Sequence, residues 1–450
     1  MKGFVPTPTH LVDVMVEKLF RDRLPSKTDR LLDPGCGTGA FIQGVLRWAT
    51  RTGNSIPQIV GIESDPKLYE EAKLRVGGSA NVTLYCEDFL TAHAEQFEYI
   101  VGNPPYVPIT GLTIEERTKY RKRYLCARGR FDLYLLFFEQ ALGMLKPNGR
   151  LVFVTPEKFL YVQSAKPLRS ALAAIDVEEI DLIDESAFGD LVTYPTITTA
   201  IRRPHRSTTR VSLRDRTTRT VNLQNGHDSW LPVLQGNAAS EPGPVLSDQF
   251  LRISCGVATG ADDIYVLNDE DVPLSLKRFA YPTISGRQMV QGARVDTTQS
   301  MLIPYLKHGA LFDESMLGAL GDYLSEPSRR VRLMARTCVA RKPWYAFHET
   351  PPLDEILRPK ILCKDIGSRP WFVVDETGDI VPRHSVYYLV PRESANINDL
   401  CEYLNSDAAL TWLMAHCQRA ANGFVRLQSH VLKRMPLPQA LLTNLQLAAV

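Results

Sequence analysis

The tetrapeptide Asn103-Pro104-Pro105-Tyr106 combines residue types suited to chemistry on an amine whose lone pair is delocalised into a ring. Such an amine is a poor nucleophile, and two hydrogen-bond acceptors aimed at its hydrogens would favour the pyramidal, attacking form. The side-chain oxygen of Asn103 and the carbonyl of Pro104 can supply these acceptors. The two prolines would hold them rigidly, which is electrostatic preorganisation. The ring of Tyr106 offers a flat face on which a base can stack.

A glycine-rich turn precedes this corner in the chain. The segment LLDPGCGTGAF (31–41) has the pattern of a strand that enters a tight turn and then a helix, and its glycines let a ligand approach the main chain. It lacks the GxGxxG spacing and the lysine of a P-loop, so NAD and ATP fit less well than a nucleoside without phosphate. S-adenosylmethionine is therefore the predicted cofactor.

The ends of the next two predicted strands complete a nucleoside site. Glu63 lies 24 residues after the last glycine of the turn, where an acid can hold a ribose diol. Asp88 and Phe89 end the third strand and suit an adenine ring. The cofactor-binding residues predicted from these strand ends are Asp33, Pro34, Gly35, Cys36, Gly37, Gly39, Glu63, Ser64, Asp88, Phe89 and Asn103.

Strand-like and helix-like segments alternate over residues 1–203, which predicts a doubly wound α/β sheet. Its seven expected strands cover 30–33, 58–63, 82–88, 97–103, 149–156, 177–184 and 193–203, and the clearest helix covers 131–146. Residues 204–247 are polar and predict a linker or irregular region. Residues 248–450 predict a second domain of mixed α/β architecture.

Composition narrows the class of protein. The chain of 450 residues is longer than a single hydrophobic core ordinarily supports, which predicts two domains. The net charge is +2. The sequence contains no run of about 18 apolar residues, so no membrane span is expected. The N-terminus has no signal-peptide pattern, and the eight cysteines form no CxxC pair, so we expect a reducing cytoplasm, no disulfide framework and no metal site. Arginine-rich stretches at 201–219 and 328–342 are either phosphate contacts or solvated faces.

The order of these motifs resembles that of gamma-class, TaqI-type adenine-N6 DNA methyltransferases. DPGCGTG, GIESD, CEDF and NPPY follow one another as in that family, and FVPTPTHLVDVM (4–15) resembles the segment before the glycine turn. The resemblance implies that Thr7, Pro8 and Phe131 border the cofactor. It also implies that Phe188 sandwiches the target adenine together with Tyr106, after the base has been flipped out of the duplex.

The resemblance extends to the C-terminal half, which is similar to the target-recognition domain of this class. The family then implies double-stranded DNA as partner, a role in restriction-modification or defence, a separate restriction endonuclease as a further partner, and a monomer. The DNA contacts it implies are Thr259, Arg287, Lys364, Asn422, Phe424 and Arg426.

Other substrates keep the same reaction type. Protein-glutamine and RNA methyltransferases also use NPPY, because an amide nitrogen has a similarly delocalised lone pair, although those enzymes lack a large C-terminal domain. Cytosine-N4 methylation stays open, while cytosine-C5 methylation would need a nucleophilic cysteine that this corner does not contain. A DNA-binding protein without catalytic activity is disfavoured by the intact motifs.

Overall fold

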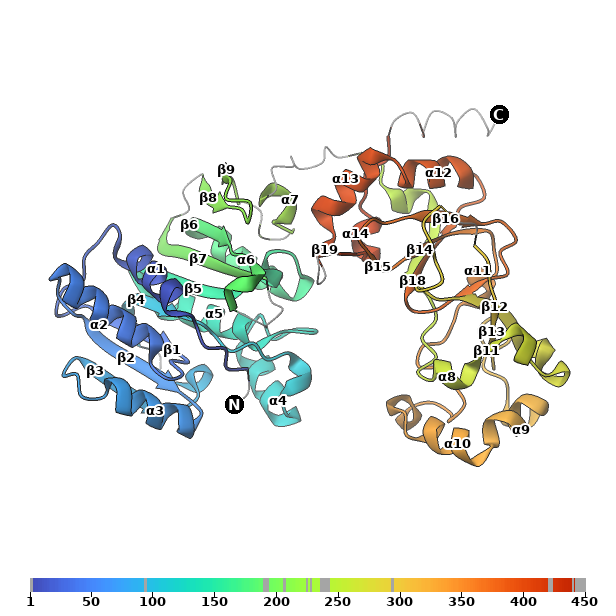
Figure 1. Cartoon of the computed structure of the whole chain (residues 1–450), viewed down its shortest axis with the longest axis horizontal. Coiled ribbons are helices and arrows are strands. Elements are labelled where there is room, and N and C mark those ends of the chain that lie inside the picture. The colour runs from blue at the N-terminus through green and yellow to red at the C-terminus, as the bar shows by residue number, and fades with distance from the viewer. Residues whose placement is uncertain are drawn as a thin grey trace. The chain divides into compact units, whose positions relative to one another are not determined.

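The computed structural model describes residues 3–92, 95–188, 194–204, 208–223, 226, 229–234, 243–292, 295–419, 424–438 and 441. The chain divides into two compact units, Met1–Ala239 and Ser240–Val450, each with its own hydrophobic cores (Figure 1). In the described part of the chain, no helix has the length and apolar character that crossing a membrane requires.

The first unit is built around one sheet. Its helices and strands are α1 (Thr9–Phe20), β1 (Arg30–Pro34), α2 (Ala40–Thr52), β2 (Gln58–Glu63), α3 (Pro66–Val76), β3 (Val82–Cys86), β4 (Phe97–Gly102), α4 (Ile114–Arg123), α5 (Leu133–Met144), β5 (Leu145–Pro156), α6 (Lys166–Ala173), β6 (Ile175–Leu182), β7 (Pro195–Pro204), β8 (Thr209–Ser212), β9 (Thr218–Val221) and α7 (Leu231–Leu234).

The strand order of this sheet is β3-β2-β1-β4-β5-β7-β6-β8-β9. Strands β1 to β5 run parallel, whereas β7 pairs antiparallel with both β5 and β6. The seven predicted strands are therefore confirmed as a doubly wound methyltransferase sheet. Two further strands, β8 and β9, continue it beyond β6 and lie within residues 204–247, for which the sequence predicted a linker or irregular region.

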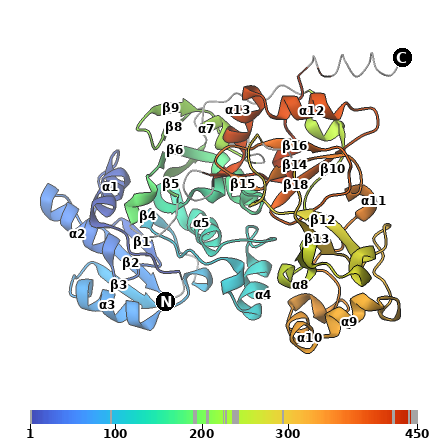
Figure 2. The same ribbon diagram turned by 45° about the vertical axis from the view of Figure 1, so that its right-hand side comes forward.

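Helices cover both faces of the sheet (Figures 1 and 2). The core with α1, α2 and α3 includes Val12, Trp48 and Ala72, and the core on the other face, with α5 and α6, includes Phe138 and Leu168. Buried strands such as β4, FEYIVG, are apolar because both faces are covered. This packing presents the carboxyl ends of the parallel strands at one edge.

The second unit contains three small sheets. Its helices and strands are β10 (Phe250–Cys255), α8 (Asp262–Tyr265), β11 (Val266–Asn268), β12 (Ala280–Ile284), β13 (Gln299–Leu302), α9 (Ala319–Ser325), α10 (Pro327–Met334), α11 (Leu353–Ile356), β14 (Lys360–Lys364), β15 (Ile366–Gly367), β16 (Phe372–Asp375), β17 (Val381–Pro382), β18 (Val386–Pro391), α12 (Ile397–Leu404), α13 (Asp407–His416), β19 (Gln418–Arg419), β20 (Val425–Arg426) and α14 (Ser429–Leu432).

The sheets of the second unit have the orders β10-β18-β14-β16, β11-β13-β12-β17 and β15-β20-β19. One core surrounds Leu302, Phe347 and Tyr388, and the other surrounds Ile361, Leu404 and Leu413. The predicted mixed α/β architecture of this half is confirmed.

Candidate active site

The site lies where the sheet changes its winding direction. Strands β1 and β4 are neighbours, but the chain continues from β1 to β2 on one side and from β4 to β5 on the other. In such sheets the loops diverge there and leave a crevice at the carboxyl ends of the strands. Asp33 lies near the end of β1, and Asn103 follows β4. The carboxyl of Asp33 lies close to the backbone of β4, because a Cβ on Gly102 would lie 3.3 Å from Asp33 Oδ1.

The glycine-rich turn after β1 adopts a conformation that favours glycine. Gly35, Gly37 and Gly39 have φ angles of 74°, 55° and 83°. A Cβ on Gly37 would also lie only 2.4 Å from the ring of Phe4. The Gly35 N–H donates to the Ile62 carbonyl at 2.8 Å, and the Gly37 N–H donates to Glu63 Oε2 at 2.9 Å. The end of β2 thereby holds the turn open.

Asp33 is a fully buried carboxyl group without a protein partner. Neither of its oxygens is hydrogen-bonded within the described residues. Burial, with a smaller contribution from the negative charge of Glu63, raises the pKa of Asp33 well above its usual value. A buried polar group in this state is costly unless a ligand pairs with it. Asp33 is thus the strongest local sign of a bound group that donates hydrogen bonds or carries positive charge.

The amide of Asn103 is held so that only its oxygen is free. Its Nδ2 donates to the carbonyl of Val5 and to the Oγ1 of Thr7, both at 3.0 Å. These two acceptors use both N–H bonds and determine which end of the amide is nitrogen. The Oδ1 of Asn103 is buried and has no partner in the described part of the chain. The side chain therefore presents an oriented, unused acceptor.

A cavity of about 190 Å³ adjoins this acceptor. It is formed by the N-terminal segment, the glycine-rich turn and the start of α2. Its lining residues are Phe4, Val5, Pro6, Thr7, Thr9, Gly35, Cys36, Thr38, Ala40, Phe41, Gln43, Arg75 and Asn103.

The remainder of the NPPY corner is fixed by the segment that precedes α5. The Ile109 N–H donates to the Phe131 carbonyl at 3.0 Å, and the Leu133 N–H donates to the Val107 carbonyl at 2.9 Å. Tyr106 lies edge to face with Tyr134, with ring centroids 6.4 Å apart. The Tyr106 hydroxyl is buried without a partner among the described residues, and burial raises its pKa.

The predicted cofactor residues are only partly brought together. Thr7, Gly35, Cys36 and Asn103 line the cavity, whereas Glu63 and Gly37 do not line it and are hydrogen-bonded to each other. Pro34 continues β1, Gly39 precedes α2, Ser64 is exposed beyond β2, and Pro8 caps α1 by accepting from the N–H groups of Leu11 and Val12.

Two predicted aromatic contacts have buried rings. The Phe89 ring packs against Phe137 with centroids 5.0 Å apart, and Phe131 is 2% exposed. Asp88 accepts from the Leu90 N–H at 2.9 Å and from the Tyr120 hydroxyl at 3.3 Å.

Phe188 ends a short 3-10 helix, Glu185–Phe188, and is half-buried. It packs against the core around α1 and α2, whereas Tyr106 packs against the core of the opposite face. That Phe188 and Tyr106 stack on the two faces of one base therefore stays a prediction.

Sequence reasoning missed residues that form the cavity. Phe4 and Arg75 line it: Arg75 belongs to no motif, and Phe4 lies in the segment 4–15, from which only Thr7 and Pro8 were predicted. Val5 contributes its main-chain carbonyl, which accepts from Asn103 Nδ2, so the identity of its side chain could not have predicted this contact. The apolar segment FVPTP was the only available hint.

The predicted DNA contacts of the second unit differ in how exposed their side chains are. Arg287, Lys364 and Arg426 are exposed, and Phe424 is 40% exposed. The turn at Gly286 lies against the stem of Lys364, and Arg426 pairs in register with Ile366, so these three cations lie in one neighbourhood. Asn422 lies outside the described residues.

Thr259 corrects a prediction. It is fully buried, its hydroxyl bonds to the Asp262 carboxylate, and its Oγ1 accepts from the Ala261 N–H at 3.0 Å. A side chain enclosed in its own loop cannot reach DNA, so the proposed contact through Thr259 is wrong. In the described part of the chain, no group of three or more His, Cys, Asp or Glu residues is placed to hold a metal ion.

The fold and the site define the class of this protein. A sheet of order 3-2-1-4-5-7-6 with a glycine-rich turn after its first strand is the doubly wound arrangement that the resemblance to methyltransferases predicts. Residues 61–188 match the family model of the Eco57I restriction-modification methylase, and residues 322–437 match that of the TaqI-like C-terminal specificity domain. The predicted resemblance is confirmed at this level: one region of the chain is similar to a restriction-modification methylase, and another is similar to a TaqI-like specificity domain.

Relatives align with nearly the whole chain. Type II methyltransferase M.PaeR7I of Pseudomonas aeruginosa is 27% identical over 97% of this chain and 86% of its own. Type II methyltransferase M.XhoI of Xanthomonas vasicola is 26% identical over 97% and 91%. The solved structure of the Type IIL restriction-modification enzyme MmeI in complex with DNA has a TM-score of 0.63 at 14% identity, covering 98% of this chain and 66% of that chain, which shows a shared fold.

Proposed function

We propose that this protein transfers a methyl group from S-adenosylmethionine to the N6 amine of an adenine in double-stranded DNA. The related Type II methyltransferases and the two family models support a DNA methyltransferase of a restriction-modification system. The single observation that carries the amine chemistry is the buried, unpartnered Oδ1 of Asn103.

The chain's residues fit the cofactor. The left-handed glycines leave room beside the main chain, and the orphaned carboxyl of Asp33 needs a donor or a cation, which the ammonium of a methionine moiety can supply. Glu63, at the end of β2, would accept from a ribose hydroxyl while keeping its bond to Gly37. When bound, S-adenosylmethionine supplies an electrophilic methyl group on a sulfonium.

Asn103 and Pro104 would act on the amine. Asn103 Oδ1 accepts one N6 hydrogen, and the Pro104 carbonyl, which accepts no backbone hydrogen bond among the described residues, accepts the other. The lone pair of the amine would then point out of the ring plane, where it could attack the methyl group that the bound cofactor would supply. The methylated nitrogen is acidic and loses a proton to water, so no strong base is required.

A base within a duplex cannot reach this corner, so the adenine must leave the stack. Tyr106 would receive it on its ring face, with Phe188 on the other side. The second unit would recognise the DNA site, with Arg287, Lys364, Phe424 and Arg426 as candidate contacts. A separate restriction endonuclease as partner, a monomeric state and a cytoplasmic location complete the proposal.

The decisive experiment is methyl incorporation from tritiated S-adenosylmethionine. Plasmid DNA, total RNA and a release-factor protein are offered in parallel, and labelled DNA is digested to nucleosides. We expect label in DNA and N6-methyladenine as the product. Label in N4-methylcytosine would overturn the adenine assignment, and label confined to RNA or protein would overturn the DNA substrate.

Thr7 is expected to act as a positioning residue for Asn103. Thr7→Val removes one of the two acceptors that hold Nδ2, so the amide can rotate; we expect kcat to fall about 10-fold, the size of one hydrogen bond of about 1.4 kcal/mol. Thr7→Ser keeps the hydroxyl and should retain nearly full kcat. Equal kcat for the valine and serine variants would contradict this role, and the dissociation constant of the cofactor separates positioning from binding.

A further inference from the structure

Residues 110–130 of the first unit form an arm with a high positive charge, and no function proposed so far involves that charge. This basic arm contains seven cations and two acids. The cations are Arg117, Lys119, Arg121, Lys122, Arg123, Arg128 and Arg130. Neither stretch that the sequence singled out as arginine-rich includes it.

Both ends of the basic arm are attached to the catalytic corner. Pro108 and Asp132 form an antiparallel bridge, flanked by the hydrogen bonds that join residues 107 and 109 to residues 133 and 131. The arm therefore leaves the sheet directly after NPPY and returns to the same place. Its position relative to Asn103 is set by the backbone, not by a flexible connection.

The inner face of the basic arm is anchored. The Tyr120 hydroxyl donates to Asp88 at 3.3 Å, and the Tyr124 hydroxyl donates to the Leu90 carbonyl at 2.6 Å. Glu139 of α5 accepts from the N–H groups of Leu125 and Cys126, both at 2.9 Å. The nearby acids thus bind the arm's tyrosines and main chain.

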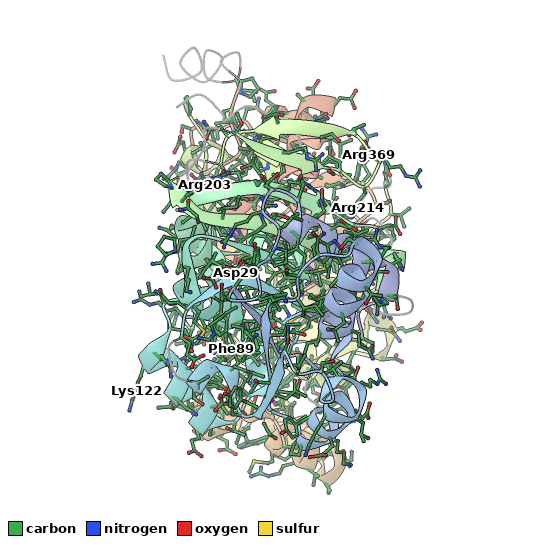
Figure 3. All side chains as sticks on the ribbon, turned by 90° about the vertical axis from the view of Figure 1, so that its left-hand side faces the viewer. Asp29, Phe89, Lys122, Arg203, Arg214 and Arg369 are labelled. Carbon is green, nitrogen blue, oxygen red and sulfur yellow. The ribbon has the colours of Figure 1, made fainter. Side chains whose placement is uncertain are left out.

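The cationic side chains of the basic arm are mostly exposed. Arg121, Lys122, Arg123, Arg128 and Arg130 are exposed, and within the described residues none of the five forms an ion pair. Figure 3 shows the Lys122 side chain pointing away from the ribbon, and α4 stands at the edge of the first unit in Figures 1 and 2. Lys119 alone lies near a carboxylate, 3.9 Å from Asp88.

Favourable interactions with the helix dipole of α4 explain only some of these cations. The basic last turn of α4 complements its dipole, and Glu115 and Glu116 complement the first turn. Arg128 and Arg130 lie beyond the helix, where that effect has ended. Cations without an ion pair that are grouped in one short segment repel one another, so a polyanion bound to that segment would relieve the repulsion as well as gain attraction.

We infer that the basic arm binds the phosphate backbone of the DNA beside the everted adenine. The inference rests on the proposed function and adds a contact surface outside the specificity unit. Phosphate contacts of this kind hold the strand in place without reading its sequence. The arm would keep the backbone near NPPY while the base occupies the site.

The test compares two charge-neutralised double variants of equal charge change. Arg121→Gln/Lys122→Gln removes two cations of the arm, and Lys67→Gln/Lys73→Gln removes two exposed cations of α3. DNA affinity is measured by fluorescence anisotropy over a range of salt concentrations, on duplexes with and without the target site. Cofactor affinity and the thermal midpoint confirm that both variants are folded.

We expect the arm variant to bind both duplexes about 10-fold more weakly and to reduce the salt slope by about 2, because each lost phosphate contact removes about 0.9 from it. The ratio between the two duplexes should not change, and the α3 variant should match the wild type. A wild-type slope and affinity in the arm variant would overturn the inference while DNA methylation by the wild type stands. Failure of the wild type to bind or methylate DNA would overturn the proposed function too.

Discussion

Asn103→Ala is expected to lower kcat for methyl transfer to DNA by about 100- to 1000-fold, the size of effect seen when one preorganised polar group is removed from a transition-state site. The alanine removes the Oδ1 that would accept an N6 hydrogen, and nothing else in the described cavity replaces it. The variant also releases Val5 and Thr7, so a smaller loss of cofactor affinity is expected. Single-turnover rates at saturating cofactor separate the two effects.

The matched control is Asn81→Ala. Asn81 lies at the start of β3, and its Nδ2 donates to the Ile56 carbonyl at 3.1 Å. That residue is also partly buried and also loses an amide hydrogen bond, so the variant should be slightly less stable with an unchanged kcat. Should Asn103→Ala transfer methyl groups as fast as Asn81→Ala, the acceptor role of Asn103 is refuted and the proposed amine chemistry with it.

Asp33→Asn is expected to weaken the binding of S-adenosylmethionine by about 10- to 100-fold, since a hydrogen bond to a charged group contributes about 1.5–3 kcal/mol. The physical reason is the position of the carboxyl group, which is fully buried and has no protein partner. Isothermal titration calorimetry measures the change, and Asp13→Asn, on the exposed face of α1, is the control. Unchanged affinity in Asp33→Asn would show that this carboxyl does not contact the ligand.

The same substitution should change how stability depends on pH. Folding raises the pKa of Asp33, so the folded state favours the protonated form. Its contribution to stability is complete below the pKa of the unfolded chain and is lost as pH rises through the folded pKa. Without ligand, the wild type should therefore lose thermal stability relative to Asp33→Asn, which stays neutral, as pH rises above about 4, the usual pKa of an unfolded aspartate. Thermal midpoints across this range test it, and parallel curves would contradict the prediction.

Local patterns in the sequence were sufficient to predict the strands of the first sheet and the residues at the ends of those strands. Alternating apolar runs predicted the seven strands, and the glycines and prolines that break them placed Asp33, the glycine-rich turn and NPPY at one edge. These signals are local, because a strand end, a left-handed turn and a proline corner each depend on a few adjacent residues.

What surrounds a predicted contact residue is not contained in the local sequence. Whether the ring of Phe89 or Phe131 faces a ligand or a core depends on what packs over it, and here α5 does. Thr259 was placed on DNA, but its loop folds around it. Burial is a property of neighbours distant in the chain.

By itself the sequence determined the sheet, the acids at its strand ends and the presence of an acceptor at residue 103. Only the tertiary structure decided which atom of Asn103 is free, because Val5 and Thr7, more than 90 residues away, occupy its N–H groups. It also decided that Asp33 has no hydrogen-bond partner among the described residues and that the basic arm returns to the catalytic corner. Hydrogen bonds between distant segments set orientation, and no run of neighbouring residues encodes them.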